Sequence, residues 1–168
     1  MLKKSHDVKI KQKKLFIGLF LLSTIFSFID LFSFINSNFY PEYFIALMVL
    51  TISSNLISIT ISKVFLIGVI VDILIGSILG EYTIVFLLLY GLQVFSQKYF
   101  LMPSKAQTIL LRFLSISFGI IIVTIISQNF NPILYNNGSL LNYLILEIAI
   151  TFFILIIFQI FYERTYGA

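Results

Sequence analysis

Long apolar stretches alternate with short polar ones along almost the whole chain. A helix needs about 20 predominantly apolar residues to cross a bilayer. Six stretches approach that length when the polar residues between them are taken as boundaries. The pattern therefore predicts an all-α integral membrane protein, a six-transmembrane-helix bundle. The predicted helices are Leu15–Ile35, Tyr43–Ile61, Val64–Leu79, Tyr82–Phe95, Thr108–Ile126 and Leu140–Phe161.

The third and fourth predicted helices are short, and only Gly80 and Glu81 separate them. Two arrangements are open. Either both helices span the bilayer, or together they form a re-entrant hairpin buried in protein. Lys63 and Lys98 lie on the same side of the membrane in both cases, so the rest of the topology does not depend on this choice.

The positions of the lysines and arginines predict the orientation, because cytoplasmic flanks of membrane helices carry an excess of these residues. We expect residues 1–14 to form a basic cytoplasmic tail, residues 15–162 the membrane domain, and residues 163–168 a short cytoplasmic tail. Arg112 lies one turn inside the fifth helix, where its long side chain is expected to reach the headgroups. The cations assigned to the cytoplasmic side are Lys3, Lys4, Lys9, Lys11, Lys13, Lys14, Lys63, Lys98, Lys105 and Arg164.

Composition supports the membrane class and limits the chemistry. The chain is 60% hydrophobic and only 11% charged, and its net charge of +4 follows the topology rather than a nucleic-acid interface. There is no cysteine, and the only histidine, His6, lies in the basic tail. Ser77 has no histidine or lysine at bilayer depth to activate it. The sequence therefore predicts no enzymatic activity, no cofactor, no metal site and no nucleic-acid partner.

The main candidate site is a carboxylate among glycines at four-residue spacing: Gly68, Asp72, Gly76 and Gly80, with Ser77 beside them. This spacing predicts one face of a helix, and small residues there allow close helix contact. A carboxylate facing lipid is costly, so Asp72 is expected to meet a donor on the second or fourth helix, a trapped water or another subunit. The face is interpreted as an internal clamp, a partner-docking surface, or both.

Three further polar residues within predicted helices are secondary candidates. Asn55 belongs to a hydroxyl-rich stripe on the second helix, and Gln93 lies on a polar stripe of the fourth. For both, helix packing is favoured over a solute-lining role. Glu147 lies roughly 10 Å below the outer boundary of the sixth helix at 1.5 Å per residue. It is either a buried hydrogen-bonding group or part of an outer, water-filled cavity.

The segment Lys63–Gly80 resembles the signature of the MreD family of rod shape-determining membrane proteins, in which a Gly-x-x-x-Asp-x-x-x-Gly-Ser-x-x-Gly run crosses the middle of the chain. Gly68, Asp72, Gly76, Ser77 and Gly80 match that run. The chain length, the number of apolar blocks, the basic N-terminus and Pro41 before the second block also agree in pattern.

The resemblance implies a non-enzymatic scaffold in the bacterial cytoplasmic membrane, with both termini in the cytoplasm, that helps to position lateral peptidoglycan synthesis and maintain cell shape. The implied partners are MreC, the actin-like MreB filament, the glycosyltransferase RodA and a penicillin-binding transpeptidase, together with the lipid bilayer.

A second function is kept as an alternative. The MreD family is similar in its six-helix architecture to the substrate-binding subunits of energy-coupling-factor vitamin transporters. In that case Glu147 and the asparagine-rich stretch Asn129–Asn137 would line a solute pocket.

Overall fold

The computed structural model describes residues 2–32, 42–54, 59–75, 78–99, 105–130 and 140–166. Within these ranges the protein is all-helical, with six helices and no strand, which confirms the predicted all-α class. The helices are α1 (Leu2–Phe32), α2 (Tyr43–Ser53), α3 (Ile61–Ile75), α4 (Glu81–Tyr99), α5 (Lys105–Phe130) and α6 (Leu140–Tyr166).

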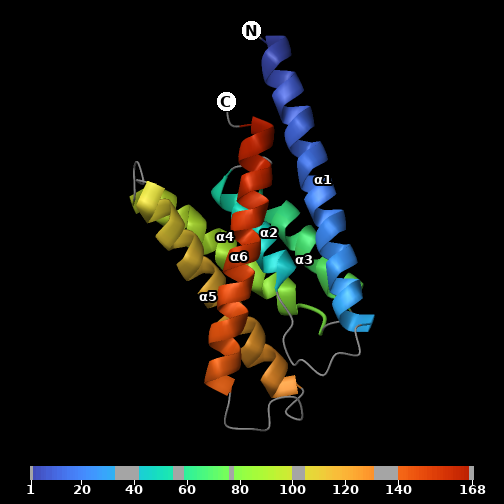
Figure 1. Cartoon of the computed structure of the whole chain (residues 1–168), viewed down its shortest axis with the longest axis vertical. Helices are drawn as coiled ribbons and strands as arrows, with labels where there is room; N and C mark the ends of the chain where they lie inside the picture. Colours follow the sequence, from blue (N-terminus) through green and yellow to red (C-terminus); the bar gives the residue numbers. More distant parts are fainter. Residues whose placement is uncertain are drawn as a thin grey trace.

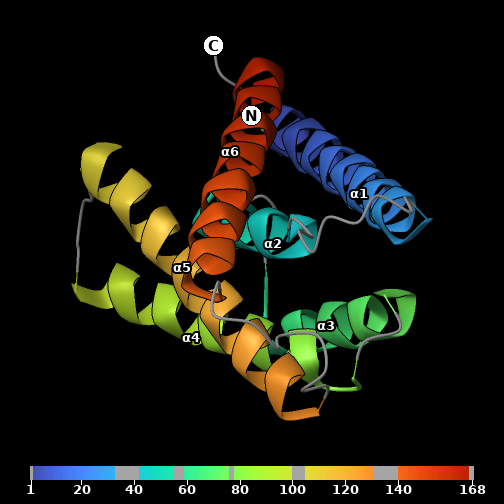
Figure 2. The same ribbon diagram turned by 60° about the horizontal axis from the view of Figure 1, so that its bottom comes forward.

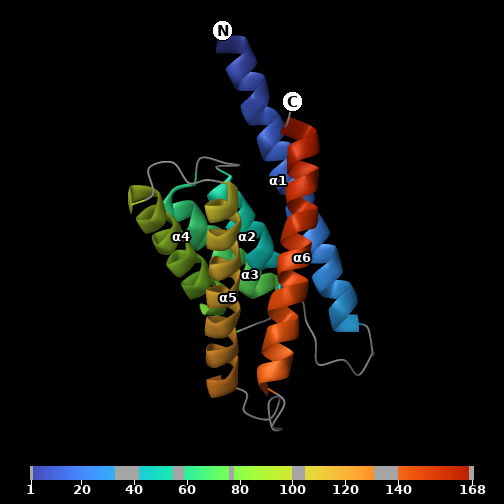
Figure 3. The same cartoon turned by 60° about the vertical axis from the view of Figure 1, so that its left-hand side comes forward.

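The long helices α1, α5 and α6 run along the molecule, and the start of α1 and the end of α6 lie at the same end (Figure 1). The end of α4 and the start of α5 also lie toward that end (Figure 3). Several helix boundaries differ from the prediction, and those of α4 and α5 lie one to four residues further out at each end. The helix α1 already begins at Leu2, so the basic segment continues the first helix, and α6 continues to Tyr166.

The short helix α2 forms the centre of the molecule. It packs against α1, α4, α5 and α6, and Figure 2 shows it enclosed by its neighbours. Every residue from Phe44 to Ile52 is buried. A helix that is apolar on all sides is expected to be enclosed in this way.

The length predicted for this helix, Tyr43–Ile61, is wrong. The helix α2 ends at Ser53, and its 11 residues span about 16 Å at 1.5 Å per residue. That is roughly half the hydrocarbon thickness of a bilayer. Serine and threonine occur both inside membrane helices and at helix ends, so the polar residues from Thr51 onward did not indicate this early end.

The helices α3 and α4 form the most extensively packed pair of the fold. The predicted third helix extends to Leu79, whereas α3 ends at Ile75, and Leu79 and Gly80 form a turn before α4. Gly80 therefore does not lie on the same helix as Gly68 and Asp72, and the prediction of one continuous helical face is wrong. Gly76 and Ser77 lie outside the described residues.

Within the described part of the chain, two helices are long and apolar enough to cross a membrane, with candidate spans Gln107–Ser127 in α5 and Leu144–Arg164 in α6. Only 17% of the span in α6 is buried, so α6 differs from the core helix of a soluble protein, which buries most of its apolar residues. Exposed large apolar side chains on these two helices include Ile109, Leu110, Phe113, Leu114, Ile145, Phe153, Ile160 and Phe161.

Candidate functional site

Asp72 on α3 caps the start of α4. Its Oδ1 accepts a hydrogen bond from the backbone N–H of Tyr82 at 2.8 Å, and its Oδ2 accepts one from the backbone N–H of Gly80 at 2.9 Å. The hydroxyl of Thr83 donates a third bond to Oδ2 at 2.6 Å. The first N–H groups of a helix have no partner within the helix, and its N-terminus favours negative charge. The carboxylate, only 1% exposed, is thus stabilised by groups of its own chain.

Gly68, four residues before Asp72 on α3, allows the backbones of α3 and α4 to come close together beside this cap. A Cβ atom built at position 68 would lie 2.5 Å from Thr83 Cα and 3.1 Å from Thr83 Cβ. No side chain fits at that distance without moving one of the two helices. Gly68 and Asp72 are one turn apart on α3, so close backbone contact and carboxylate cap act on the same residue of α4, Thr83.

Gly80 lies in the turn before α4 with φ +104°, a conformation in which a side chain is strained. Its backbone carbonyl accepts a hydrogen bond from the N–H of Ile84 at 2.9 Å, and its own N–H donates to Asp72. The glycine is therefore required by the turn that brings the start of α4 to Asp72, rather than by helix packing.

A second carboxylate extends this cap into a polar junction between helices. Glu42 precedes α2, and its Oε2 accepts a hydrogen bond from the Tyr82 hydroxyl at 2.7 Å. The backbone N–H of Glu42 donates to Thr151 Oγ1 on α6 at 3.1 Å. The residue next to Tyr82, Glu81, accepts a hydrogen bond from the hydroxyl of Ser127 on α5. We call the set Glu42, Asp72, Glu81, Tyr82, Thr83, Ser127 and Thr151 the α4 junction.

Burial is the main influence on Glu42, which is 9% exposed and lies in the connection before α2. Burial raises the pKa of its carboxyl to about 8. The neighbouring Glu147 and Glu81 carboxylates act in the same direction, and the hydrogen bond from Tyr82 opposes them. Loss of water around a carboxyl disfavours its charged form, so this group holds a proton at neutral pH.

The opposite end of α2 is held by Arg112 of α5. Its guanidinium donates to Ser53 Oγ at 2.9 Å and to Ser54 Oγ at 3.1 Å, and its third bond goes to Gln159 Oε1 of α6. A cation at the C-terminal end of a helix is favoured by the helix dipole. Arg112 is only 8% exposed, so the prediction that it reaches the headgroups is wrong: the side chain turns inward and fixes the end of the short helix.

The structure brings only part of the predicted site together. Gly68, Asp72 and Gly80 meet at the start of α4. Glu147 is half-buried on α6, one turn before Thr151 and close enough to Glu42 to affect its charge. Gln93 lies near the other end of α4, where its backbone carbonyl accepts a hydrogen bond from Ser96. Asn55, Gly76 and Ser77 lie outside the described residues.

Sequence reasoning did not single out Glu42, Tyr82 or Thr83. One signal was present, since Gly80 and Glu81 are followed by two residues with side-chain hydroxyls at the start of a helix, where a carboxylate from a neighbouring helix can find donors. The contact between Glu42 and Tyr82 joins residues 40 positions apart, and no local pattern indicates it.

A comparison with family models, curated proteins and solved structures finds no match. The arrangement of the junction is therefore interpreted from its own chemistry. In the described residues, no group of three or more histidine, cysteine, aspartate or glutamate side chains is arranged to hold a metal ion. The junction connects α2, α3, α4, α5 and α6 through hydrogen bonds.

Proposed function

We propose that this chain is a multi-pass protein of the bacterial cytoplasmic membrane that acts as a non-enzymatic scaffold in the cell-elongation complex. In this role it helps to position lateral peptidoglycan synthesis and so to maintain cell shape. The resemblance of Lys63–Gly80 to the MreD signature supplies the biological context. MreC is the first expected partner, followed by RodA, a penicillin-binding transpeptidase and MreB.

The observation that carries the proposal is the fixed α3–α4 pair. The residues that carry the resemblance, Gly68 and Asp72, hold α4 by a backbone contact and three hydrogen bonds. A scaffold needs such a fixed pair, because partner helices recognise surfaces whose geometry does not change. The glycine and carboxylate serve this purpose from inside the protein.

The outer faces of the pair are available for partners. On α3, exposed Leu66, Ile70 and Ile73 follow helical spacing, and on α4 exposed Ile84 and Leu88 do the same. Contiguous apolar surface of this kind is typical of lipid or protein contact sites. The proposed docking surface therefore differs from the glycine face predicted in the sequence, which is covered by α4.

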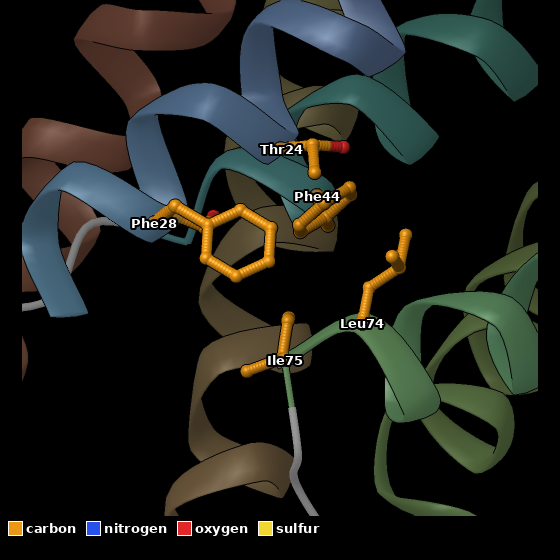
Figure 4. Close-up of a pocket in the computed structure, with 6 residues that line it drawn as sticks. Thr24, Phe28, Phe44, Leu74 and Ile75 are labelled. Carbon is orange, nitrogen blue, oxygen red and sulfur yellow. The ribbon is translucent and has the colours of Figure 1, made fainter.

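A solute-binding role is less well supported. The pocket between α1, α2 and the end of α3 is lined by side chains that include Phe28, Phe44 and Leu74 (Figure 4). Its volume is about 20 Å³, enough for roughly one water molecule. Small-molecule sites commonly enclose about 300–1,000 Å³, so this pocket is too small for a vitamin. Residues 131–137 of the stretch predicted to line a solute site with Glu147 lie outside the described residues.

The experiment compares two classes of variant in a rod-shaped bacterium that depends on this chain for its MreD-like function. Asp72→Asn should lower the amount of folded protein in the membrane, because the amide brings an N–H₂ donor to a place where N–H and O–H donors already point. Leu66→Trp and Leu88→Trp should leave the protein level normal but reduce co-purification of the MreC-like partner and produce rounded cells.

Ile145→Trp is the matched control for the surface variants, since Ile145 is an exposed apolar residue on α6, a helix that packs mainly against α2 and α5. It should preserve both cell shape and partner recovery. The proposal is refuted if both α3–α4 surface variants, at normal protein level, retain rod shape and full recovery of the partner.

A further inference from the structure

The α4 junction contains a carboxyl group, that of Glu42, which the scaffold role does not require. Glu42 is buried where the start of α2 meets the start of α4 and the middle of α6. Hydrophobic residues follow it directly, Phe44 to Ile52 being buried without interruption. An ionised carboxylate in such surroundings is costly unless it is well paired.

Among the described residues, the groups that act on Glu42 do not supply a positive charge. From α4 come the Tyr82 hydroxyl, at 2.7 Å, and the Glu81 carboxyl. From α6 come Thr151, which is neutral and binds the backbone, and the Glu147 carboxyl. Asp72 of α3 joins the same junction through the Tyr82 N–H.

The cation that binds α2 is remote from Glu42. Arg112 holds Ser53 and Ser54 at the other end of α2, about 16 Å away at 1.5 Å per helical residue. A proton is thus the positive charge that this geometry accommodates most readily. It neutralises Glu42 and leaves Oε2 free to accept the bond from Tyr82.

We propose that Glu42 is a proton-binding switch: protonated, it lets α2, α4 and α6 pack closely, and on losing its proton it loosens their junction. The inference does not rest on the scaffold function, since it concerns the folded chain alone. The direction of the pH dependence follows from the difference in proton affinity between the folded and the unfolded protein. The carboxyl binds its proton more tightly in the folded than in the unfolded protein, so the stabilisation is complete in mild acid and is lost as pH rises toward about 8.

The test uses the purified full chain in phosphatidylcholine nanodiscs between pH 5 and pH 9. Hydrogen exchange of the α2 amides, corrected for the intrinsic effect of pH, reports the opening of the junction. We expect the opening equilibrium to rise with pH, by up to about tenfold per unit within the titration range. Glu42→Gln, which keeps an acceptor for Tyr82 and carries no charge, should remove most of this dependence and keep the low-pH value.

Glu163→Gln is the control, because Glu163 is exposed on the last turns of α6 and should leave the wild-type dependence intact. Glu81→Gln and Glu147→Gln should shift the transition to lower pH by removing a neighbouring carboxylate, without abolishing it. An unchanged pH dependence in Glu42→Gln overturns the proposal.

A second measurement covers the case in which Glu42→Gln does not fold. Infrared spectroscopy of the wild-type chain should show the C=O band of a buried protonated carboxyl that disappears as pH rises. Tyr82→Phe, which removes the hydroxyl donor, should move this band to higher frequency. If the wild-type chain shows no such band at pH 6, or if Tyr82→Phe leaves its frequency unchanged, the assignment to Glu42 is wrong.

Discussion

Replacing Gly68 with alanine should destabilise the protein, although the same change usually stabilises a helix. The new Cβ would lie 2.5 Å from Thr83 Cα, whereas ordinary contact begins near 3.4 Å. Because protein interiors are close-packed, the contact can be relieved only by moving α3 and α4 apart by roughly 1 Å. The atom that blocks the Cβ belongs to backbone, so no side-chain rotation removes the clash.

The magnitude follows from three terms. Overpacking of this kind costs about 1–3 kcal/mol. The same displacement stretches the bond from Thr83 to Asp72, now 2.6 Å, and a hydrogen bond to a charged group contributes about 1.5–3 kcal/mol. Alanine regains about 1 kcal/mol of helix propensity. The net loss of stability should be about 1.5–5 kcal/mol.

Unfolding in mixed micelles, followed by circular dichroism as the denaturing detergent is increased, measures the change. Gly91→Ala is the matched control, since Gly91 is also a helical glycine but a Cβ there would meet nothing within 4 Å. It should raise stability by up to about 1 kcal/mol. If both variants change stability in the same direction, Gly68 does not hold α3 and α4 at the distance described.

Three other changes separate the remaining contacts with the same unfolding measurement. Gly80→Ala forces a side chain into φ +104° and should cost about 1–3 kcal/mol; no loss would contradict the turn geometry. Ser23→Ala removes a buried hydroxyl that has no hydrogen-bond partner among the described residues and should stabilise the protein, whereas Ser115→Ala removes a hydroxyl bonded to a helix carbonyl and should not. Arg112→Ala leaves three acceptors without their donor and should cost about 2–4 kcal/mol; a neutral result would show that the guanidinium does not secure the end of α2.

The sequence predicted the helical class and the shielding of Asp72. Both follow from the cost of placing a polar group, either a backbone N–H or C=O or a carboxylate, in apolar surroundings without a hydrogen-bond partner. A carboxylate within an apolar helix must find donors, and the fourth helix was among the expected sources. What the sequence could not predict is where helices end inside apolar runs. The end of α2 at Ser53 depends on Arg112 reaching across from α5, and the turn at Gly80 depends on Asp72 capping the next helix. Contacts between helices decide both, and local patterns do not contain them.

The internal position of Asp72 changes what a partner can recognise. Had the glycine and carboxylate face been open, a partner would have needed to supply donors to a charged group within the bilayer, and its loss would have left that charge unpaired. Here α4 supplies at least three donors from the same chain, so the cost of the buried charge is offset before any partner binds. Under the proposed function, partners then dock on the apolar outer faces of α3 and α4. Binding there can be reversible, since separating two apolar helix faces in lipid exposes no unpaired polar group.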